Sequence, residues 1–289
     1  MGRVIKIFQI DAFTNTAFGG NPAGVSFGSG LSDSEMQSIA REMNLSETAF
    51  LCSSDKADYK LRWFTPTTEV DLCGHATIAS LHFLNENNII KNNSSIRFET
   101  RSGILNCRME DGRYFMEIPA MEVSNYSGDT SAIINALGIP QDKLEETHPF
   151  ILLENGYLYL HVKSIDSLSN LKPNFKELLN ASESGKLFTA AVPFTLQTAD
   201  RESFAHIRFF GPYYGIDEDP VTGSANGPLI LVLQKLGLLK NDEDKISLQF
   251  EQGDFINKRG RIGVTYTKSK NEIYISGEAV TVIKGELFF

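Results

Sequence analysis

The fold is decided by a stretch that this chain contains twice: first as Arg62-Trp63-Phe64-Thr65-Pro66 with Cys73-Gly74-His75-Ala76, then as Arg208-Phe209-Phe210-Gly211-Pro212 with Thr222-Gly223-Ser224-Ala225. In each copy an aromatic strand ends at proline, a polar loop follows, and a glycine opens a strongly apolar segment. The prolines lie 146 residues apart (212 − 66) and the glycines 149 (223 − 74), which is half of the chain. Such a repeat predicts two similar domains whose equivalent loops can face each other across a cleft, a favoured place for small ligands.

The segments that follow the two glycines predict buried helices. Ala76–Leu84 and Pro228–Leu236 are apolar on almost every side, so each helix is expected in the interior, and Gly237 is a plausible stop for the second. Because the surrounding sequence is made of short strands, a strongly curved sheet is expected to wrap around each helix. The expected fold class is therefore α+β.

The remaining elements complete this picture. A surface helix is expected after Ser32, because Glu35 stands at the capping-box spacing and apolar residues recur at helical period. The first domain is expected to comprise residues 1–118 with a returning strand at about 279–289, and the second residues 119–278. The predicted strands are Ile96–Thr100, Ile104–Met109 and Arg113–Ile118 in the first half, and Phe150–Glu154, Tyr157–Lys163, Leu187–Leu196, Phe204–Phe210, Ile246–Phe250, Ile262–Thr267 and Ile273–Ser276 in the second, with Ala279–Ile283 as the returning strand.

Composition narrows the class of protein. The chain of 289 residues is 42% hydrophobic and 22% charged, an ordinary globular composition, and its net charge of −9 argues against nucleic acid as a partner. Three cysteines without CxxC spacing favour a reducing compartment over a disulfide scaffold or a zinc site. The N-terminal residues read as a strand and the longest apolar run, Leu229–Leu233, is too short for a bilayer. We therefore expect a cytoplasmic protein without membrane contact.

The two helix openings are candidate binding sites. A glycine at a helix start lets a ligand approach the backbone, and the unpaired N–H groups and the positive helix end suit an anion such as a carboxylate. Gly74 and Gly223 are thus expected to contact a small carboxylate substrate. The alternative is that each glycine only serves a tight turn, and the presence of both copies favours the binding interpretation.

Polar residues beside these openings are candidates for chemistry. Glu47 precedes an apolar strand, where desolvation would raise its pKa towards that of a general acid or base, although it could simply be a solvated strand cap. His75 directly follows the first glycine and could donate a hydrogen bond or relay a proton, or be structural. Asp219 stands beside Glu218, and clustered carboxylates separate acid from base, while Asp217 and Glu218 themselves are expected to be solvated. Ser224, at the place of His75 in the second copy, could bind substrate or cap its helix.

Other chemistries find no support in the sequence. It contains no GxSxG, Walker or GxGxxG motif, and Cys73 with His75 is too small a set for a metal site. No metal or other cofactor is therefore expected.

Taken together the motifs resemble the PhzF (phenazine biosynthesis-like) family, within the diaminopimelate epimerase fold. The matching stretches keep their order along the whole chain: Asp11-Ala12-Phe13, Gly20-Asn21-Pro22-Ala23, Ser46-Glu47-Thr48-Ala49-Phe50, Arg62-Trp63-Phe64-Thr65-Pro66, Cys73-Gly74-His75-Ala76-Thr77 and Glu218-Asp219-Pro220-Val221-Thr222-Gly223-Ser224-Ala225. The resemblance implies two pseudo-symmetric barrel-like domains, each around a central helix, with the site between them. It also implies a homodimer and proton transfer without a cofactor.

The resemblance also implies roles for particular residues. Glu47 matches the acid/base of the family, assisted by His75, Asp219 and Ser224, and Asn21 falls among the expected substrate-binding residues. Related epimerases and proline racemase-like enzymes use two cysteines, one before each helix-opening glycine, whereas this chain has Cys73 in the first place and Thr222 in the second. This difference favours an isomerase. Two alternatives stay open: a racemase or epimerase that uses one thiol with Glu47, and a non-catalytic protein that binds a metabolite or a partner.

Overall fold

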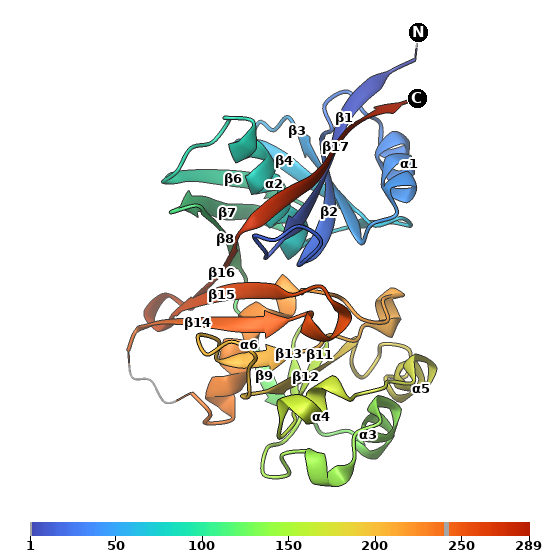
Figure 1. Cartoon of the computed structure of the whole chain (residues 1–289), viewed down its shortest axis with the longest axis vertical. Helices are drawn as coiled ribbons and strands as arrows, with labels where there is room; N and C mark the ends of the chain where they lie inside the picture. The colour runs from blue at the N-terminus through green and yellow to red at the C-terminus, as the bar shows by residue number, and fades with distance from the viewer. Residues whose placement is uncertain (1, 240–242) are drawn as a thin grey trace. The chain divides into compact units, whose positions relative to one another are not determined.

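The computed structural model of the chain describes residues 2–239 and 243–289 (Figure 1). The chain divides into two compact units, one formed by residues up to Ile118 together with Tyr274–Phe289, the other by Pro119–Ile273. Each unit is α+β, with a curved mixed sheet around one buried helix, which confirms the predicted fold class. Strand β16 (Glu272–Gly277) crosses the division between the units.

In the first unit, a sheet wraps the helix α2 (Gly74–Glu86) and the amphipathic helix α1 (Asp33–Met43) covers part of it. The predicted capping box is present, since the Ser32 side chain accepts from the Glu35 N–H and the Glu35 carboxylate accepts from the Ser32 N–H. The strands are β1 (Val4–Ala12), β2 (Asn21–Phe27), β3 (Glu47–Cys52), β4 (Tyr59–Phe64), β5 (Glu69–Val70), β6 (Ser94–Thr100), β7 (Gly103–Glu110), β8 (Arg113–Ile118) and β17 (Ala279–Phe288).

The second unit is built around the helix α6 (Gly223–Lys235). Its strands are β9 (Val123–Asn125), β10 (Ile151–Leu153), β11 (Tyr157–His161), β12 (Ala190–Thr195), β13 (Ala205–Ile207), β14 (Lys245–Gln252) and β15 (Gly260–Thr267). Its other helices are α3 (Ser131–Leu137), α4 (Ile165–Ser169) and α5 (Phe175–Ala181), with single 3₁₀ turns at Gln141–Lys143, Pro212–Tyr214, Asp254–Ile256 and Lys268–Lys270.

The internal repeat extends to the pairing of the strands. In the first unit β1–β2 is antiparallel, β2–β3 parallel, β3–β4 antiparallel, β4–β6 parallel with α2 in the connection, and β6–β7 antiparallel. In the second unit β10 to β15 follow the same five relations in the same order, with α6 in the equivalent connection. The predicted returning strand also forms, because β17 pairs antiparallel with β1 along its length. Two parallel connections per unit make the sheets mixed.

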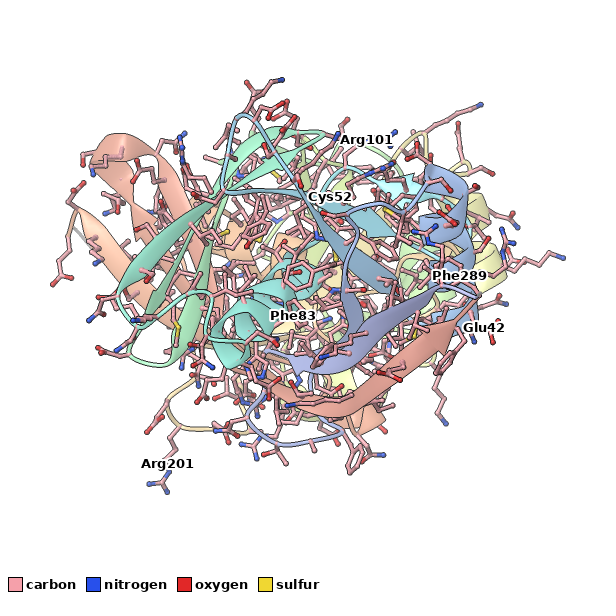
Figure 2. The ribbon with its side chains drawn as sticks, turned by 90° about the horizontal axis from the view of Figure 1, so that it is seen from above. Glu42, Cys52, Phe83, Arg101, Arg201 and Phe289 are labelled. Atoms are coloured by element: carbon pink, nitrogen blue, oxygen red, sulfur yellow. The ribbon has the colours of Figure 1, made fainter. Side chains whose placement is uncertain are left out.

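Burial of α2 on nearly all sides follows from its sequence. Nine of its residues, from His75 to Leu84, are buried, and Phe83 packs edge-to-face against Phe8 and Phe27 with ring centroids 4.8 and 5.1 Å apart. Figure 2 shows Phe83 inside the ring of strands, whereas Arg101 and Glu42 lie at its outside. Burying a phenylalanine or leucine side chain stabilises a fold by about 1.5–3 kcal/mol, so this helix anchors the unit.

Several expected boundaries differ from the structure. Helix α6 begins at Gly223 and not at the expected Pro228. The expectation placed this proline in the first turn, but it lies inside the helix. Strand β13 has three residues, fewer than the expected Phe204–Phe210. The segment nevertheless continues beside β12, because the Arg208 N–H donates to the Pro193 carbonyl and Phe210 forms a bridge to Ala191, while Pro193 has no N–H to complete the ladder. The short helices α3, α4 and α5 were not predicted, because segments of five to seven residues carry little periodicity of their own.

One glycine fixes the start of β2. Gly20 adopts φ +57°, and a Cβ there would lie 2.1 Å from the carbonyl oxygen of Ala12. A side chain at this position would thus be strained by its backbone angle and by a direct clash. The turn places Asn21 at the first position of β2, where its side chain is fully buried.

Candidate active site

Three element starts converge in the first unit. Asn21 opens β2, Glu47 opens β3, and His75 lies in the first turn of α2. Strands β2 and β3 run parallel with Ala23 opposite Glu47, so both strands start at the same sheet edge. The Glu47 Oε2 atom lies 3.2 Å from His75 Nε2, and Asn21 Nδ2 lies 3.3 Å from His75 Nδ1. The imidazole therefore joins an amide on one side to a carboxylate on the other.

The proton on His75 can be placed from these neighbours. Burial lowers the pKa of His75, whereas the Cys73 and Glu47 side chains beside the ring raise that pKa well above its ordinary value while they carry negative charge. The Asn21 amide favours the neutral ring instead, because its N–H donates to Nδ1. Both effects are compatible with a proton on Nε2, the ring nitrogen that faces the Glu47 carboxylate at 3.2 Å. Glu47 is 13% exposed and so retains access to solvent or substrate.

Cys73 lies against the same imidazole, with Sγ 3.5 Å from His75 Nδ1. Burial, reinforced by the charge of Glu47, raises the pKa of this thiol from 9.0 to about 11. At neutral pH it is therefore a thiol, and the thiolate is the form that abstracts protons or attacks carbon. Of the two side chains, Glu47 is therefore the candidate base.

The start of α2 is left open for an anion. Its N-cap residue Cys73 makes no side-chain capping bond, and its first turn holds no acidic residue. Helix α1 differs in both respects, with the Ser32 cap and with Asp33 and Glu35 in its first turn. Because the first N–H groups and the positive end of a helix favour negative charge, the opening at Gly74 suits a carboxylate.

In the second unit, the start of α6 is organised by a buried polar network. The Thr222 hydroxyl donates to the Asp219 carboxylate, and the Thr222 N–H donates to Gln252 Oε1 at 2.8 Å. Gln252 Nε2 donates to the Asp219 carbonyl at 2.8 Å, and Asn226 Nδ2 donates to Gln252 Oε1 at 2.7 Å. Asp219 therefore fixes the turn that leads into Gly223. Like α2, helix α6 has neither a side-chain cap nor an acidic residue in its first turn.

Ser224 lies one residue inside α6 and its N-cap is Thr222, so Ser224 is not a helix cap. Its Oγ atom lies 3.3 Å from the Tyr157 hydroxyl at the start of β11. The Tyr157 ring packs edge-to-face on Phe209, 5.1 Å away. Ser224 thus belongs to a pair of hydroxyl groups that can donate or accept hydrogen bonds.

The predicted site residues fall into two sets. Asn21, Glu47, Gly74 and His75 come together in the first unit, and Asp219, Gly223 and Ser224 gather at the start of α6 in the second. That the two sets serve one substrate stays a prediction.

Glu218, which the sequence suggested as a carboxylate partner of Asp219 and as solvated, is instead bound to Arg208. Sequence reasoning also missed Gln252 and Tyr157. Neither carries a local motif, since each reaches the site from a strand distant in sequence.

Two clusters contain residue types that bind metals. In the first, Glu47, Cys73 and His75 place ligand atoms within 4.8 Å of one another, but both ring nitrogens of His75 already have partners and the positive start of α2 disfavours a cation. In the second, His206 lies between Glu251 and Asp254, and the Arg261 guanidinium contacts Asp254 at 2.9 Å. That guanidinium supplies the positive charge that a metal would supply, so neither geometry selects a metal.

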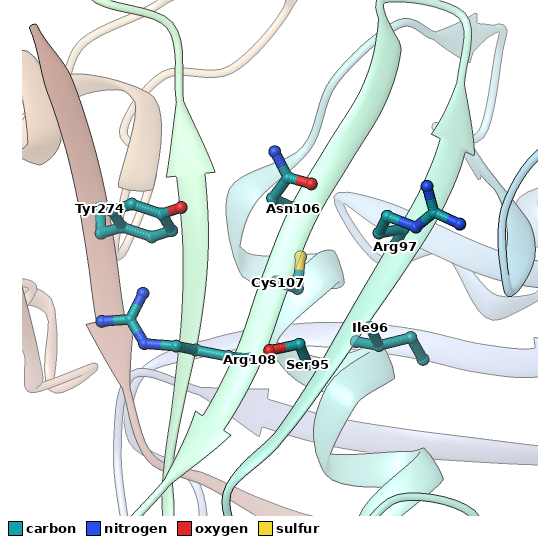
Figure 3. A pocket seen from close by; sticks show the side chains of 7 residues that line it. All are labelled: Ser95, Ile96, Arg97, Asn106, Cys107, Arg108 and Tyr274. Atoms are coloured by element: carbon teal, nitrogen blue, oxygen red, sulfur yellow. The ribbon is translucent and has the colours of Figure 1, made fainter. Parts of the chain in front are cut away.

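A surface hollow lies elsewhere in the first unit (Figure 3). It is lined by Ser95, Ile96, Arg97, Asn106, Cys107, Arg108 and Tyr274, on β6, β7 and β16. Arg108 lies between the rings of Phe115 and Tyr274, at 4.2 and 4.6 Å, and Figure 3 shows Arg97 extending away from it. The two guanidinium groups do not converge on one point, and none of the candidate site residues lines this hollow.

Comparison with known proteins places the chain in a described family. The sequence model of the family described as "Phenazine biosynthesis-like protein" matches residues 10–285. An uncharacterised isomerase of Clostridium acetobutylicum is 38% identical over 303 residues, which cover 99% of each chain. The crystal structure of a PhzF-family phenazine biosynthesis protein of Bacillus anthracis has a TM-score of 0.91 at 33% identity, covering 99% of this chain and 100% of the other.

A more distant likeness supports the fold alone. A hydroxyproline epimerase of Agrobacterium vitis, solved with trans-4-hydroxy-L-proline, has a TM-score of 0.59 at 12% identity and covers 99% of this chain. Within the described residues every helix is too short or too polar to cross a membrane.

Proposed function

Because the chain belongs to the phenazine biosynthesis-like protein family and is an isomerase, we propose that it moves a proton within a small carboxylic acid, without a cofactor, using Glu47 as acid and base. The proposal is carried by the 3.2 Å contact between Glu47 Oε2 and His75 Nε2. This pair lies beside the open start of α2, where a substrate carboxylate would find amide donors. A base and an anion-binding group therefore stand next to each other.

The proposed reaction needs only one placed carboxylate. Glu47 takes a proton from a carbon next to a carbonyl or conjugated group, and the electron pair of the broken C–H bond enters the conjugated system. Protonated Glu47 then returns the proton to another carbon of the same molecule, so substrate and product contain the same atoms. Proton transfer by such a group contributes roughly 10²–10⁴-fold to the rate. Orientation and the amide donors at Gly74 would supply the rest by stabilising developing negative charge.

His75 has a supporting role in this proposal. Its Nε2 atom faces the Glu47 carboxylate at 3.2 Å and would orient it, while Asn21 contacts the ring from the opposite side. Asn21 and His75 thus prepare the carboxylate for transfer.

The second unit is proposed to hold the substrate. Gly223 would offer its backbone N–H and Ser224 its hydroxyl, and Asp219 would act through Thr222 by fixing the turn before the helix. Arg208 is occupied by Glu218, so this set of residues binds by hydrogen bonds and not by a free guanidinium.

The racemase alternative is weaker on the same geometry. Two-base racemisation of the cysteine type needs two thiols, and this chain has a thiol of raised pKa at Cys73 and a hydroxyl at Thr222. A purely binding role would leave the Glu47–His75 pair without a use. Each alternative predicts a distinct fate for the substrate proton.

The test is a screen of small unsaturated and amino carboxylic acids with the protein in deuterated water. The proposal predicts a positional isomer as product, with deuterium at the carbon that receives the proton in those turnovers in which the Glu47 carboxyl proton exchanges with solvent before it is returned. Label at the original carbon with inverted configuration would establish the racemase instead. Tight binding of a compound with neither label nor product would establish the binding role.

A further inference from the structure

We infer that a repeated arginine–glutamate pair positions the two helix openings: Arg62 with Glu69 in the first unit and Arg208 with Glu218 in the second. These four are positioning residues, since each acts through the loop that it holds. The inference depends on the proposed function only in that these loops lead to Gly74 and Gly223. The inference is tested by cysteine alkylation and amide exchange, which do not require enzyme activity. It can therefore fail while the proposed function holds, and the reverse.

The first pair is largely buried, with side chains 14% and 11% exposed, and bidentate. Arg62 Nε donates to Glu69 Oε1 at 2.7 Å and Nη2 donates to Oε2 at 2.8 Å. Arg62 also stacks over the ring of Phe64 at 5.1 Å, and Nη1 reaches Asp33 at 2.7 Å. The hydrogen bonds that Arg62 donates to the Glu69 carboxylate raise the pKa of Arg62 above its ordinary value, with burial opposing.

The second pair repeats the first atom by atom. Arg208 Nε donates to Glu218 Oε1 at 2.8 Å, Nη2 donates to Oε2 at 2.7 Å, and the guanidinium lies 4.8 Å from the ring of Phe210. Its Nη1 donates at 3.1 Å to the carbonyls of Leu168 and Leu171, at the end of α4. The equivalent Nη1 atom of Arg62 donates to Asp33 instead. The arginine–glutamate geometry is thus shared, whereas the third partner differs.

The sequence positions of the pairs are equivalent in the two copies. Each arginine stands two residues before the aromatic ring on which it stacks, and each glutamate stands five residues before the helix-opening glycine. The loops between them differ in length by three residues. Despite this difference in loop length, each glutamate stands the same number of residues before its glycine, as expected of a residue that positions the helix opening.

The chemistry of the pair suits this task. A guanidinium binds a carboxylate through two parallel bonds in one plane, which fixes direction as well as distance, and lysine cannot reproduce that geometry. Only three residues separate Glu69 from Cys73, and three separate Glu218 from Thr222. Holding the glutamate therefore restrains the residue before each glycine.

The experiment uses Cys73 as a reporter, because it is buried directly behind the first loop. Alkylation of native protein by iodoacetamide is followed by peptide mass spectrometry in Glu69→Gln and Arg62→Lys. Each is expected to raise the rate at Cys73 by about tenfold, because a buried charged hydrogen bond that holds the loop closed is lost. Cys107, buried in the β6–β8 meander, serves as the internal control and should keep its rate.

Asp33→Asn is the matched control variant. It removes the third bond to Arg62 at a side chain that is 81% exposed, and should leave the Cys73 rate within about twofold because exposed ion pairs contribute little. Equal rates in Glu69→Gln and Asp33→Asn would overturn the inference. So would a parallel rise at Cys107, which would mark general unfolding; Glu69→Asp, which keeps the charge, should lie between wild type and Glu69→Gln.

The second pair is tested by hydrogen exchange. Glu218→Gln should accelerate amide exchange in residues 211–222, at Thr222 above all, and leave residues 65–73 unchanged. Unchanged exchange at Thr222 in a folded Glu218→Gln variant would overturn the claim for this unit.

Discussion

Glu47 and Glu69 show how the partner of a carboxylate decides its use. Both side chains are largely buried, 13% and 11% exposed, and each lies near the opening of α2. Glu69 is held by a guanidinium, which stays charged at any physiological pH, whereas Glu47 faces an imidazole that can gain or lose a proton. Glu69 is therefore held in place by its partner, whereas Glu47 faces a group that can itself exchange protons, as the role proposed for Glu47 requires.

Cys73 gives a prediction at alkaline pH. Burial raises its pKa from 9.0 to about 11, so the unfolded chain loses the thiol proton first as pH rises. The stability due to the neutral thiol is complete below pH 9 and is lost between pH 9 and 11, by about 2–3 kcal/mol. We expect urea unfolding of wild type to lose that much more stability between pH 8 and 11 than Cys73→Ala does. Parallel curves for the two proteins would contradict the assignment.

At the residue scale, the sequence located the ionisable groups but not their bonds. Glu47 and His75 could be predicted because each stands beside a strand or helix start. The partner of Ser224 could not, since Tyr157 lies 67 residues earlier on another strand. Glu218 was misjudged as solvated, although aligning the copies from their glycines puts it opposite Glu69.

At the scale of elements, α2 is both the core of its unit and the support of His75. Leu81 lies two turns from His75 and is fully buried. Leu81→Ala should lower the free energy of unfolding by about 2–5 kcal/mol, because it removes packed atoms and leaves a cavity. Chemical denaturation measures this directly. A loss below 1 kcal/mol would mean that the helix is less tightly enclosed than its burial indicates.

A pair of histidines beside β11 should make the second unit sensitive to acid. His148 Nδ1 and His161 Nδ1 lie 2.8 Å apart, and burial together with His148 lowers the pKa of His161 to about 4. Neutral His161 therefore contributes stability above pH 6.5 that is lost as pH falls towards 4, by about 1–2 kcal/mol after allowing for solvent screening. His161→Phe, which keeps an aromatic ring beside Phe194, should lose less stability than wild type between pH 7 and pH 4. An equal loss would contradict this account.

The buried helices were predictable because their apolar pattern is continuous, and the capped helix α1 because its cap is a local motif. The helices α3 and α5 could not be predicted in this way, since their stability comes from a shared hydrophobic cluster that includes Ile133, Leu137 and Leu178. Tertiary packing of this kind leaves no signal in a window of seven residues.

At the scale of the whole molecule, one plan occurs twice and has diverged in its chemistry. Both units share strand relations, an open helix start and an arginine–glutamate pair. The first places His75 and Glu47 at its opening, whereas the second has the hydroxyl groups of Ser224 and Tyr157 together with Asp219, which accepts from the Thr222 hydroxyl. The repeat was visible in the sequence, but this division of roles depends on contacts between elements far apart in the chain.

The central claim is tested most directly by replacing Glu47 and following solvent deuterium into a substrate found by the screen. Glu47→Gln keeps the size of the side chain and removes the base, and Glu42→Gln, at the exposed end of α1, is the matched control (Figure 2). We predict that Glu47→Gln lowers the rate of label incorporation by about 10²–10⁴-fold while Glu42→Gln leaves it unchanged. Incorporation at the wild-type rate in folded Glu47→Gln would contradict the assignment of Glu47 as the acid and base.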